Sequence, residues 1–305
     1  MADLALIKKL REATGCGIAD CNKALAENGD DFEKSVDWLR KKGLSAAVKK
    51  GGRITSEGVV ATQINGSDAV ILEVNSETDF VSRNQKFQDF VKALATAAFG
   101  CGNSVDALKA KTYPGLAVTV DKELKNQIGV IGENINIRRV DNLSVKNGLV
   151  VSYIHNAVAP NLGKIAVLVG LESTGDKAKL EEFGKQIAMH IAAAKPDALT
   201  IESVDPSKLN REIDVLKEQA RASGKPENII EKMMEGRVRK YYEDVVLLEQ
   251  NFVMDDKVKI KDLLKNFGKE IGAEVIISDF KLFILGEGIE KKENDFAAEV
   301  ASMTK

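Results

Sequence analysis

The chain carries the same pattern twice: a β-hairpin followed by a long helix. In the first copy, apolar strand-like runs at 58–64 and 69–74 flank Asn65-Gly66, a pair typical of tight hairpin turns. A helical pattern with an apolar stripe follows over about 83–98. This order predicts a sheet whose apolar face is covered by a helix.

The second copy lies further along the chain. We expect a hairpin that turns at Asn147-Gly148, followed by strands over 149–154 and 164–171. The next helix covers about 176–195 and ends before Pro196, because proline disfavours helical backbone in the residue before it. Two such copies in 305 residues predict an α+β fold whose core consists of two related α/β subdomains with antiparallel sheets.

The N-terminal segment, residues 1–53, is expected to form a small three-helix bundle followed by a basic linker. The first helix ends at Gly15, and the third begins after Asp30 or Asp31 and ends at Gly43. Residues 40–53 contain lysine and arginine but no acidic residue. They are either a solvated tether or a patch for nucleic acid, and the residues leave both readings open.

Two long helical patterns near the middle of the chain are separated by Gly224-Lys225-Pro226 and predict an antiparallel helical hairpin. Acidic and basic side chains are balanced there, as expected for a solvated arm. Its apolar stripe is expected to include Leu209, Met233, Arg237 and Tyr241. The predicted domains are 1–53 (bundle and linker), 54–140 (core subdomain N), 141–200 with 245–288 (core subdomain C), 201–244 (antiparallel coiled-coil insertion) and 289–305 (a short C-terminal helical module).

Composition excludes several classes of protein. The net charge of −2 argues against a chain that mainly coats nucleic acid or an anionic membrane. No apolar stretch is long enough to span a bilayer, and the N-terminus is not a secretory signal. The three cysteines are sparse and odd in number, so we expect reduced thiols and a cytoplasmic location.

Covalent catalysis is not expected either. The chain has only two histidines, and neither belongs to a cluster with metal-ligand spacing. Glycine-rich phosphate loops and nucleophile-elbow motifs are absent, so we predict no cofactor and no metal. His190 lies within a helical pattern and is expected to be a surface or packing residue. The chain is therefore not expected to be an enzyme.

The polar corner at 75–81, Asn-Ser-Glu-Thr-Asp-Phe-Val, joins the strand 69–74 to the helix after it. Serine, threonine and aspartate are ordinary turn and cap residues, but Phe80 is not. If Ser82 caps the helix, the staple partner of Val81 is Lys86, which fits poorly. From the residues alone, Phe80 either packs locally or contacts a partner.

Several long segments, taken in this order, resemble the bacterial translation elongation factor Ts family. The resemblance is close and covers nearly the whole chain. It rests on residues 10–25 (LREATGCGIADCNKAL), 73–81 (EVNSETDFV), 131–140 (IGENINIRRV), 187–196 (IAMHIAAAKP), 223–226 (SGKP), 231–237 (EKMMEGR) and 295–300 (DFAAEV).

The resemblance implies a guanine-nucleotide exchange factor that acts on the GTPase elongation factor Tu in the cytoplasm. It also implies a ubiquitin-associated-like N-terminal bundle, a core of two α/β subdomains, an inserted antiparallel coiled coil and a C-terminal module. Direct nucleotide binding and membrane contact are not implied, and RNA would be met only indirectly. Two alternatives remain: a non-catalytic scaffold or chaperone of the same GTPase, and an RNA-associated adaptor that uses residues 40–53.

The resemblance further implies roles for particular residues. Phe80 would wedge between two GTPase helices near the magnesium site, Asp79 would hold the corner or bind a polar group of the GTPase, and Thr78 and Val81 would fix the loop. The other implied contacts are Ile18 and Ala19 in the bundle, His155 in the second subdomain, and Asp295 and Phe296, which would position the C-terminal helix.

Two departures from the family pattern qualify these roles. Members usually carry two methionines where Ile18-Ala19 stands, so the apolar contact there should be smaller. Residues 157–163 lengthen the turn after His155.

Overall fold

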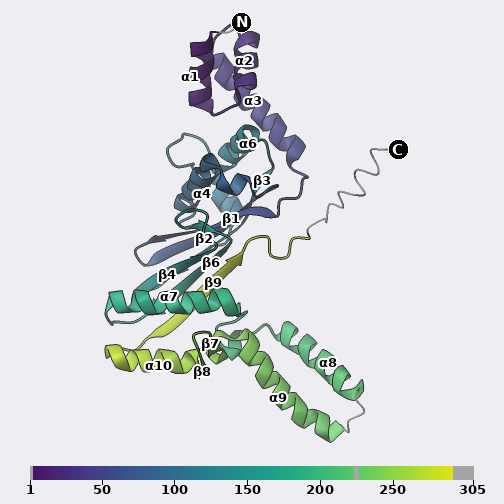
Figure 1. Ribbon diagram of the computed structural model, residues 1–305, viewed down its shortest axis with the longest axis vertical. Helices are drawn as coiled ribbons and strands as arrows, with labels where there is room; N and C mark the ends of the chain where they lie inside the picture. Colours follow the sequence, from purple (N-terminus) through teal and green to yellow (C-terminus); the bar gives the residue numbers. More distant parts are fainter. Residues whose placement is uncertain (1–2, 223–226, 291–305) are drawn as a thin grey trace. The chain divides into compact units, whose positions relative to one another are not determined.

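The computed structural model describes residues 3–222 and 227–290 (Figure 1). The chain divides into two compact units. Unit 1 comprises Met1–Val60, Leu72–Val140 and Ile284–Lys305, and unit 2 comprises Ala61–Ile71 and Asp141–Phe283. Helices and antiparallel strands both contribute to the fold, which confirms the predicted α+β class.

The strands form three sheets. The four-stranded sheet has the order β3-β2-β1-β5, the three-stranded sheet has the order β4-β6-β9, and β7 pairs with β8. Their bounds are β1 Glu57–Asn65, β2 Asp68–Ser76, β3 Ile135–Ser144, β4 Gly148–His155, β5 Leu162–Gly163, β6 Ile165–Glu172, β7 Asn251–Phe252, β8 Asp255–Lys259 and β9 Ile276–Ile284.

The predicted hairpin turn at Asn147-Gly148 is wrong. The strands on either side of it, β3 and β4, belong to different sheets, and β4 instead pairs antiparallel with β6. Gly148 opens β4 at a point of close approach to β6, where a Cβ atom would lie 1.9 Å from the carbonyl oxygen of Leu171. Gly148 therefore allows β4 to lie close to β6. The turn that connects these two paired strands lies after His155.

The N-terminal bundle of unit 1 consists of α1 (Leu4–Thr14), α2 (Ile18–Glu27) and α3 (Phe32–Lys50). Gly15 ends α1 in the left-handed conformation, as predicted. Asp31, not Asp30, caps α3 by accepting a hydrogen bond from the backbone N–H of Lys34. The small core contains Leu10, Cys21, Ala24, Leu25 and Leu39.

The prediction that α3 ends at Gly43 is also wrong. The helix continues to Lys50, so most of the expected basic linker is helical. Gly43 is buried opposite Gly129 of α6 (Val120–Ile131), and a Cβ atom on Gly129 would lie 2.6 Å from the Cα of Gly43. Gly129 therefore lets α6 approach α3 closely at Gly43, and Gly43 does not end its own helix.

The remaining described helices include four that were not predicted: α5 and the three short 3-10 helices η1, η2 and η3. In unit 1 the remaining helices are η1 (Val81–Arg83), α4 (Gln85–Ala97) and α5 (Val105–Ala110). In unit 2 they are α7 (Lys177–Ala194), η2 (Ile201–Ser203), α8 (Pro206–Ala222), α9 (Glu227–Val245), η3 (Leu247–Glu249) and α10 (Ile260–Ile271). The C-terminal helix predicted near 294–302 lies outside the described residues.

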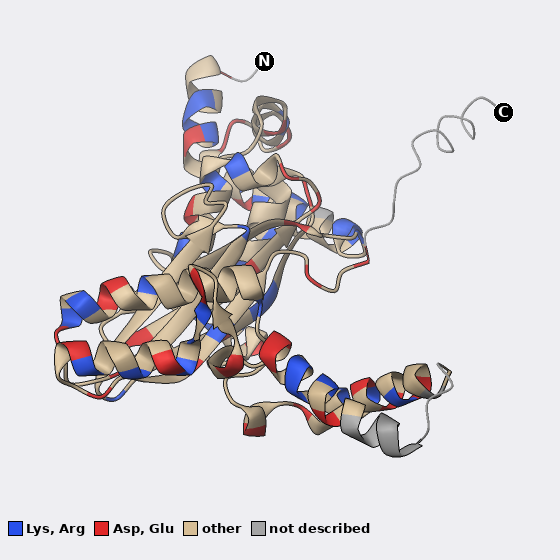
Figure 2. Ribbon diagram, turned by 60° about the horizontal axis from the view of Figure 1, so that its bottom comes forward, with Lys and Arg blue, Asp and Glu red and all other residues tan. Residues whose placement is uncertain are grey.

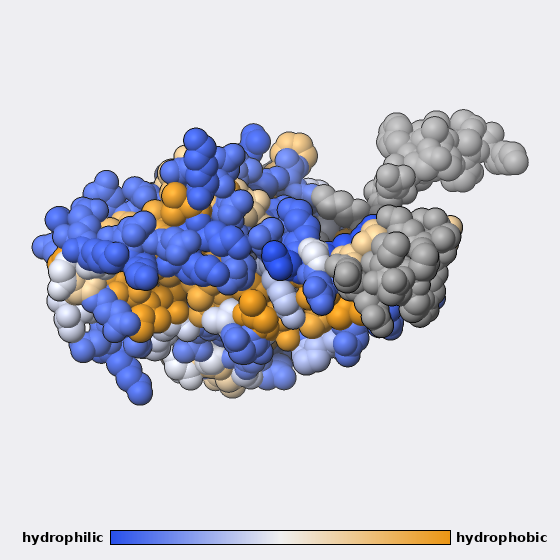
Figure 3. Space-filling view, turned by 90° about the horizontal axis from the view of Figure 1, so that it is seen from below, coloured by the Kyte–Doolittle hydropathy of each residue, from blue (hydrophilic) through white to orange (hydrophobic). Residues whose placement is uncertain are grey.

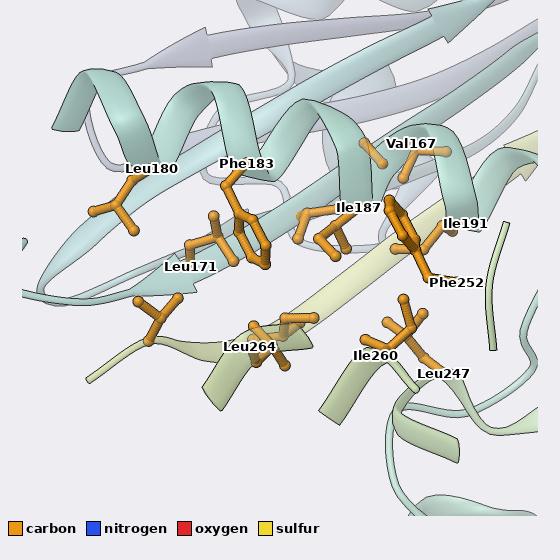
Figure 4. Packing of buried hydrophobic residues seen from close by; sticks show 14 of the residues in the cluster. Val167, Leu171, Leu180, Phe183, Ile187, Ile191, Leu247, Phe252, Ile260 and Leu264 are labelled. Atoms are coloured by element: carbon orange, nitrogen blue, oxygen red, sulfur yellow. The ribbon is translucent and has the colours of Figure 1, made fainter. Parts of the chain in front are cut away.

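The core of unit 2 forms where α7 packs against β4 and β6. Phe183 of α7 stacks on Phe267 of α10 with ring centroids 4.0 Å apart. Figure 4 shows the surrounding apolar side chains, which come from α7, β6, η3, β7 and α10.

Figure 3, a view from below, shows a band of apolar residues on the surface with hydrophilic residues beside it. Ile276 of the edge strand β9 is half exposed.

The helices α8 and α9 run side by side in Figure 1, and the coloured parts of both carry both signs of charge (Figure 2). Ala220 and Met234 are buried between them, with Val238 packed alongside. The stripe of α9 therefore passes through Met234 and Val238, one position from the predicted Met233 and Arg237. Leu209 and Tyr241 pack, as predicted, near the base of the pair.

None of the helices described within residues 3–222 and 227–290 is both long enough and apolar enough to cross a bilayer.

The crossing of α3 and α6 predicts that Gly129→Ala lowers the stability of the protein, whereas Gly43→Ala does not. Gly129→Ala should lower the free energy of unfolding by about 1–3 kcal/mol, because its methyl group meets the backbone of Gly43. Gly43→Ala is the matched control: its Cβ makes only ordinary contacts, the nearest at 3.8 Å. That variant should match the wild type or gain up to about 1 kcal/mol from helix propensity. Urea unfolding of both variants checks this, and equal effects would contradict the assigned contact.

Candidate partner-binding site

At the corner after β2, the neighbouring side chains of Phe80 and Val81 point in opposite directions. The Phe80 ring is 78% exposed, whereas Val81 is 5% exposed and packs inward. Phe80 is the residue before the short helix η1, so the chain turns at this point. The local-packing alternative for Phe80 is therefore excluded. Val81 anchors the corner, and Phe80 is free to meet a partner.

The predicted helix cap at this corner is wrong. Asn84, not Ser82, caps α4 and accepts a hydrogen bond from the backbone N–H of Lys86 at 2.9 Å. Ser82 is buried in η1, where its hydroxyl donates to the carbonyl oxygen of Asp79 at 2.6 Å. The carbonyl oxygen of Ser82 accepts from the side-chain amide of Gln88 at 2.9 Å. One extra helical turn therefore separates Phe80 from α4.

A glutamate far away in the sequence holds the other side of the corner. The backbone N–H and the hydroxyl of Thr78 donate to the two carboxylate oxygens of Glu133, at 2.9 Å and 2.6 Å. In return, the carboxylate of Glu77 accepts from the backbone N–H of Asn134 at 2.6 Å. The same carboxylate pairs with Arg53 at 3.2 Å. Neither glutamate was predicted as a site residue, although both lie in segments that carry the family resemblance, 73–81 and 131–140.

A third carboxylate, that of Glu73, lies on β2 close to the corner. Its side chain is fully buried and accepts from Arg138 at 3.0 Å, from Arg139 at 2.7 Å and from Asn75 at 2.9 Å. The backbone N–H of Gly286 donates to it at 2.8 Å. Burial alone would raise the pKa of this carboxyl, but these hydrogen bonds and the arginine charges outweigh burial and lower it. Glu73 is therefore an ionised hub that ties the segment around Gly286 to β2.

The bundle presents the two residues expected to contact a partner. Ile18 and Ala19 are exposed in the first turn of α2, and 58% of Ile18 is accessible. The end of α1 is linked to α4, because the ammonium group of Lys86 donates to the carbonyl oxygen of Gly15 at 3.0 Å. Ile18 and Ala19 are the first two residues of α2.

The two histidines differ in their surroundings. His155 is the last residue of β4; it is exposed, and its Nδ1 lies 3.0 Å from the hydroxyl of Tyr153. His190 is buried in α7, where Nδ1 accepts from the backbone N–H of Val253 and Nε2 lies 3.0 Å from the Gln250 amide oxygen. Burial lowers the pKa of His190, and the bond to Gln250 opposes this only in part. His190 is thus a neutral packing residue, one of the two predicted alternatives.

Two predicted contact residues, Asp295 and Phe296, lie outside the described residues. Across the described part of the chain, no group of three or more histidine, cysteine, aspartate or glutamate side chains is arranged to hold a metal ion. All three cysteines are unpaired thiols. What the geometry offers is an exposed aromatic ring on a hydrogen-bonded corner, which is a feature of a protein-binding surface.

Comparison with known proteins identifies relatives of the whole chain. A family model described as "Elongation factor TS" matches residues 77–287, which include the corner from Glu77 onward and Glu133. The elongation factor Ts of Rhodospirillum centenum is 58% identical over 299 residues, covering 98% of this chain and 97% of that protein. The protein of the same name from Paramagnetospirillum magneticum is 55% identical over 298 residues (98% and 96%), and that from Bartonella henselae is 54% identical over 301 residues (99% and 98%).

The Glu73 hub predicts a pH-dependent loss of stability. Glu73→Gln should lower the free energy of unfolding by about 3 kcal/mol near neutral pH, because it leaves two arginines without their buried partner. Because the folded-state pKa is lowered, this contribution is present above the ordinary carboxyl pKa of 4.5 and is lost as pH falls through the folded value. Urea unfolding should therefore show a gap to the wild type that is constant above about pH 5 and narrows below pH 4.5.

Glu287→Gln is the matched control for this measurement. Glu287 also pairs with Arg139, at 3.5 Å, but its side chain is 53% exposed. Its substitution should change stability by less than about 1 kcal/mol. Equal losses in the two variants would contradict the role given to the buried carboxylate.

Proposed function

The chain belongs to the elongation factor Ts family, and we propose that the Phe80 ring drives the nucleotide exchange that defines this family. The protein is a guanine-nucleotide exchange factor for elongation factor Tu in translation elongation. It acts by binding its GTPase and catalyses no covalent chemistry. The observation that supports the proposal is the 78% exposure of Phe80 beside the buried Val81.

An exposed ring on a fixed corner suits a role as a wedge. Aromatic side chains are frequent among the few residues that supply most of the energy of a protein interface. The backbone of this corner is already ordered by Glu133 and by the η1 turn. Ordering on binding therefore costs little, and more of the contact energy is available to deform the partner.

The proposed target is the magnesium site of elongation factor Tu. In GTPases, Mg²⁺ bridges the phosphates to the protein and neutralises their charge. A ring that enters between two helices near this site displaces the elements that hold the ion, and the bound GDP then loses affinity. Thr78, Asp79, Phe80 and Val81 together form the segment that presses on the site, with Phe80 as the wedge.

Thermodynamic reciprocity sets the size of the effect. If the exchange factor weakens nucleotide binding by some factor, the nucleotide weakens binding of the exchange factor by the same factor. A loosening of about 10⁴-fold requires about 5.5 kcal/mol of differential binding. One buried aromatic side chain supplies on the order of 2–4 kcal/mol. Phe80 therefore needs additional contacts, for which we propose Ile18, Ala19 and His155, together with Asp295 and Phe296.

The architecture implied by the family is part of the same proposal. The bundle α1–α3 would be the ubiquitin-associated-like module, α8 and α9 an antiparallel coiled coil inserted into subdomain C, and 289–305 the C-terminal module. The protein would act in the cytoplasm without binding nucleotide itself. A scaffold or chaperone of the same GTPase is the second candidate, and an RNA adaptor that uses residues 40–53 is the third; the scaffold would use the exposed ring for binding alone, and the adaptor does not explain the ring.

Phe80→Ala tests the wedge. The substitution should slow release of fluorescent GDP from elongation factor Tu at saturating exchange factor by about tenfold or more, since that loss corresponds to about 1.4 kcal/mol of contact energy. Stopped-flow fluorescence measures the rate. Ile64→Ala, which truncates another exposed apolar residue, is the control and should leave the rate unchanged. Wild-type release by the Phe80 variant would remove the wedge and favour the scaffold.

Ile18→Asp tests the contact proposed for the bundle. A charge at this exposed apolar position should raise the concentration of exchange factor needed for half-maximal GDP release by about tenfold, while the saturating rate stays within about twofold. The matched control is Leu4→Asp, because Leu4 is an even more exposed apolar residue of the same bundle. If both variants weaken binding equally, the effect is a general one of charge.

A further inference from the structure

We infer that Glu77 and Glu133 form a clasp that positions Phe80 for exchange. The two glutamates belong to different segments and exchange hydrogen bonds: Glu133 binds Thr78, and Glu77 binds Asn134. Neither carboxylate is proposed to contact the partner, so both act through the corner. This inference rests on the proposed function of Phe80, and it adds residues outside the segment 78–81.

The clasp joins a corner whose other hydrogen bonds are local: the Ser76 hydroxyl donates to the carbonyl oxygen of Thr78, and backbone N–H groups of η1 and Asn84 donate to the carbonyl oxygens of residues 79–81. Asp79 and Phe80 are exposed, so their side chains add no packing that would fix the backbone between Thr78 and Val81. On the far side, the corner is held by buried Val81 and by the bond from Ser82 to the carbonyl oxygen of Asp79. On the near side, the Glu133 carboxylate takes two donors from Thr78. Hydrogen bonds to an ionised group are about twice as strong as neutral ones.

The other end of the clasp is itself fixed. Lys50, the last residue of α3, donates to the carbonyl oxygen of Gly132, and the Asn134 amide donates to the carbonyl oxygen of Arg53 at 2.9 Å. Arg53 also pairs with Glu77. The segments 50–53, 77–78 and 132–134 therefore meet in one polar junction within unit 1. This junction sits at the ends of the two helices that cross at Gly43 and Gly129.

A loosened corner should affect the rate of exchange more than the affinity of the complex. The proposed contacts at Ile18 and Ala19 lie outside the junction and stay intact when Glu133 is truncated. If the backbone that carries the Phe80 ring is flexible, however, contact with the partner displaces the ring and not the helices of the partner. The clasp should thus contribute to the saturating rate of GDP release and leave half-saturation nearly unchanged.

The test uses the full chain, elongation factor Tu loaded with fluorescent GDP, and four proteins: wild type, Glu133→Ala, Phe80→Ala and the double variant. Glu133→Ala should lower the saturating release rate by about fivefold to tenfold, with half-saturation within about twofold. In the Phe80→Ala background, the same change should lower the rate by less than about 1.5-fold, because the ring that Glu133 positions is gone.

Two further variants separate positioning from folding. Glu133→Gln keeps an oxygen acceptor for the backbone N–H of Thr78 but loses the charge, so its rate should lie between wild type and Glu133→Ala. Asp121→Ala removes a carboxylate of α6 that pairs with Lys125 of the same helix at 2.6 Å, and it should leave the rate unchanged. If Glu133→Ala does not fold, the Glu133→Gln series in both backgrounds gives the same comparison.

The outcomes distinguish this inference from the function on which it rests. Wild-type release by Phe80→Ala removes the proposed wedge, and the clasp with it. Slow release by Phe80→Ala, combined with an equal further loss from Glu133→Ala in both backgrounds, keeps the wedge and overturns the clasp. A wild-type rate for Glu133→Ala alone also overturns the clasp. Loss confined to the background that retains Phe80 supports it.

Discussion

The conformation of the corner at 77–81 depends on hydrogen bonds from the loop that follows α6. Here the chain has left β2 but has not yet entered α4, so its backbone groups lack partners from a sheet or a long helix. Glu133 accepts the backbone N–H of Thr78, and Ser82 donates to the carbonyl oxygen of Asp79. These hydrogen bonds fix the backbone of the corner in one conformation. That conformation sets the direction of the Phe80 side chain.

Carboxylates carry out this ordering at two neighbouring points of unit 1. Glu73 is fully buried, and a buried charge is destabilising unless several donors compensate it. It has two arginines, an amide and a backbone N–H as partners, which fix the segment after β9 against β2. Glu133 plays a similar part for Thr78, but it is only half buried. In both cases a charged acceptor binds backbone donors and so selects one backbone path.

Elements bounded by local signals could be predicted from the sequence, whereas features created by distant contacts could not. Helix α7 lies between the cap Asp176 and Pro196, much as predicted, because capping and proline sterics act over a few residues. Gly43 and Gly148 were predicted to be a helix end and a hairpin turn, but Gly43 lies inside α3 opposite Gly129, and Gly148 is a glycine because β6 comes close to it. A single sequence does not contain that second partner next to the glycine, so the local reading was the wrong one.

In the candidate site, too, local features could be predicted from the sequence, whereas features that depend on distant contacts could not. The odd position of an aromatic residue in a polar corner drew attention to Phe80, but a partner-binding role for residues 78–81 came only from the family resemblance. Whether Phe80 or Val81 points outward depends on the η1 turn, and the stiffness of the corner depends on Glu133, 55 residues away. In the proposed mechanism, the ring can displace elements of the partner only if its own backbone support does not yield. The proposed wedge therefore needs both the exposed Phe80 ring and the polar junction that holds the corner.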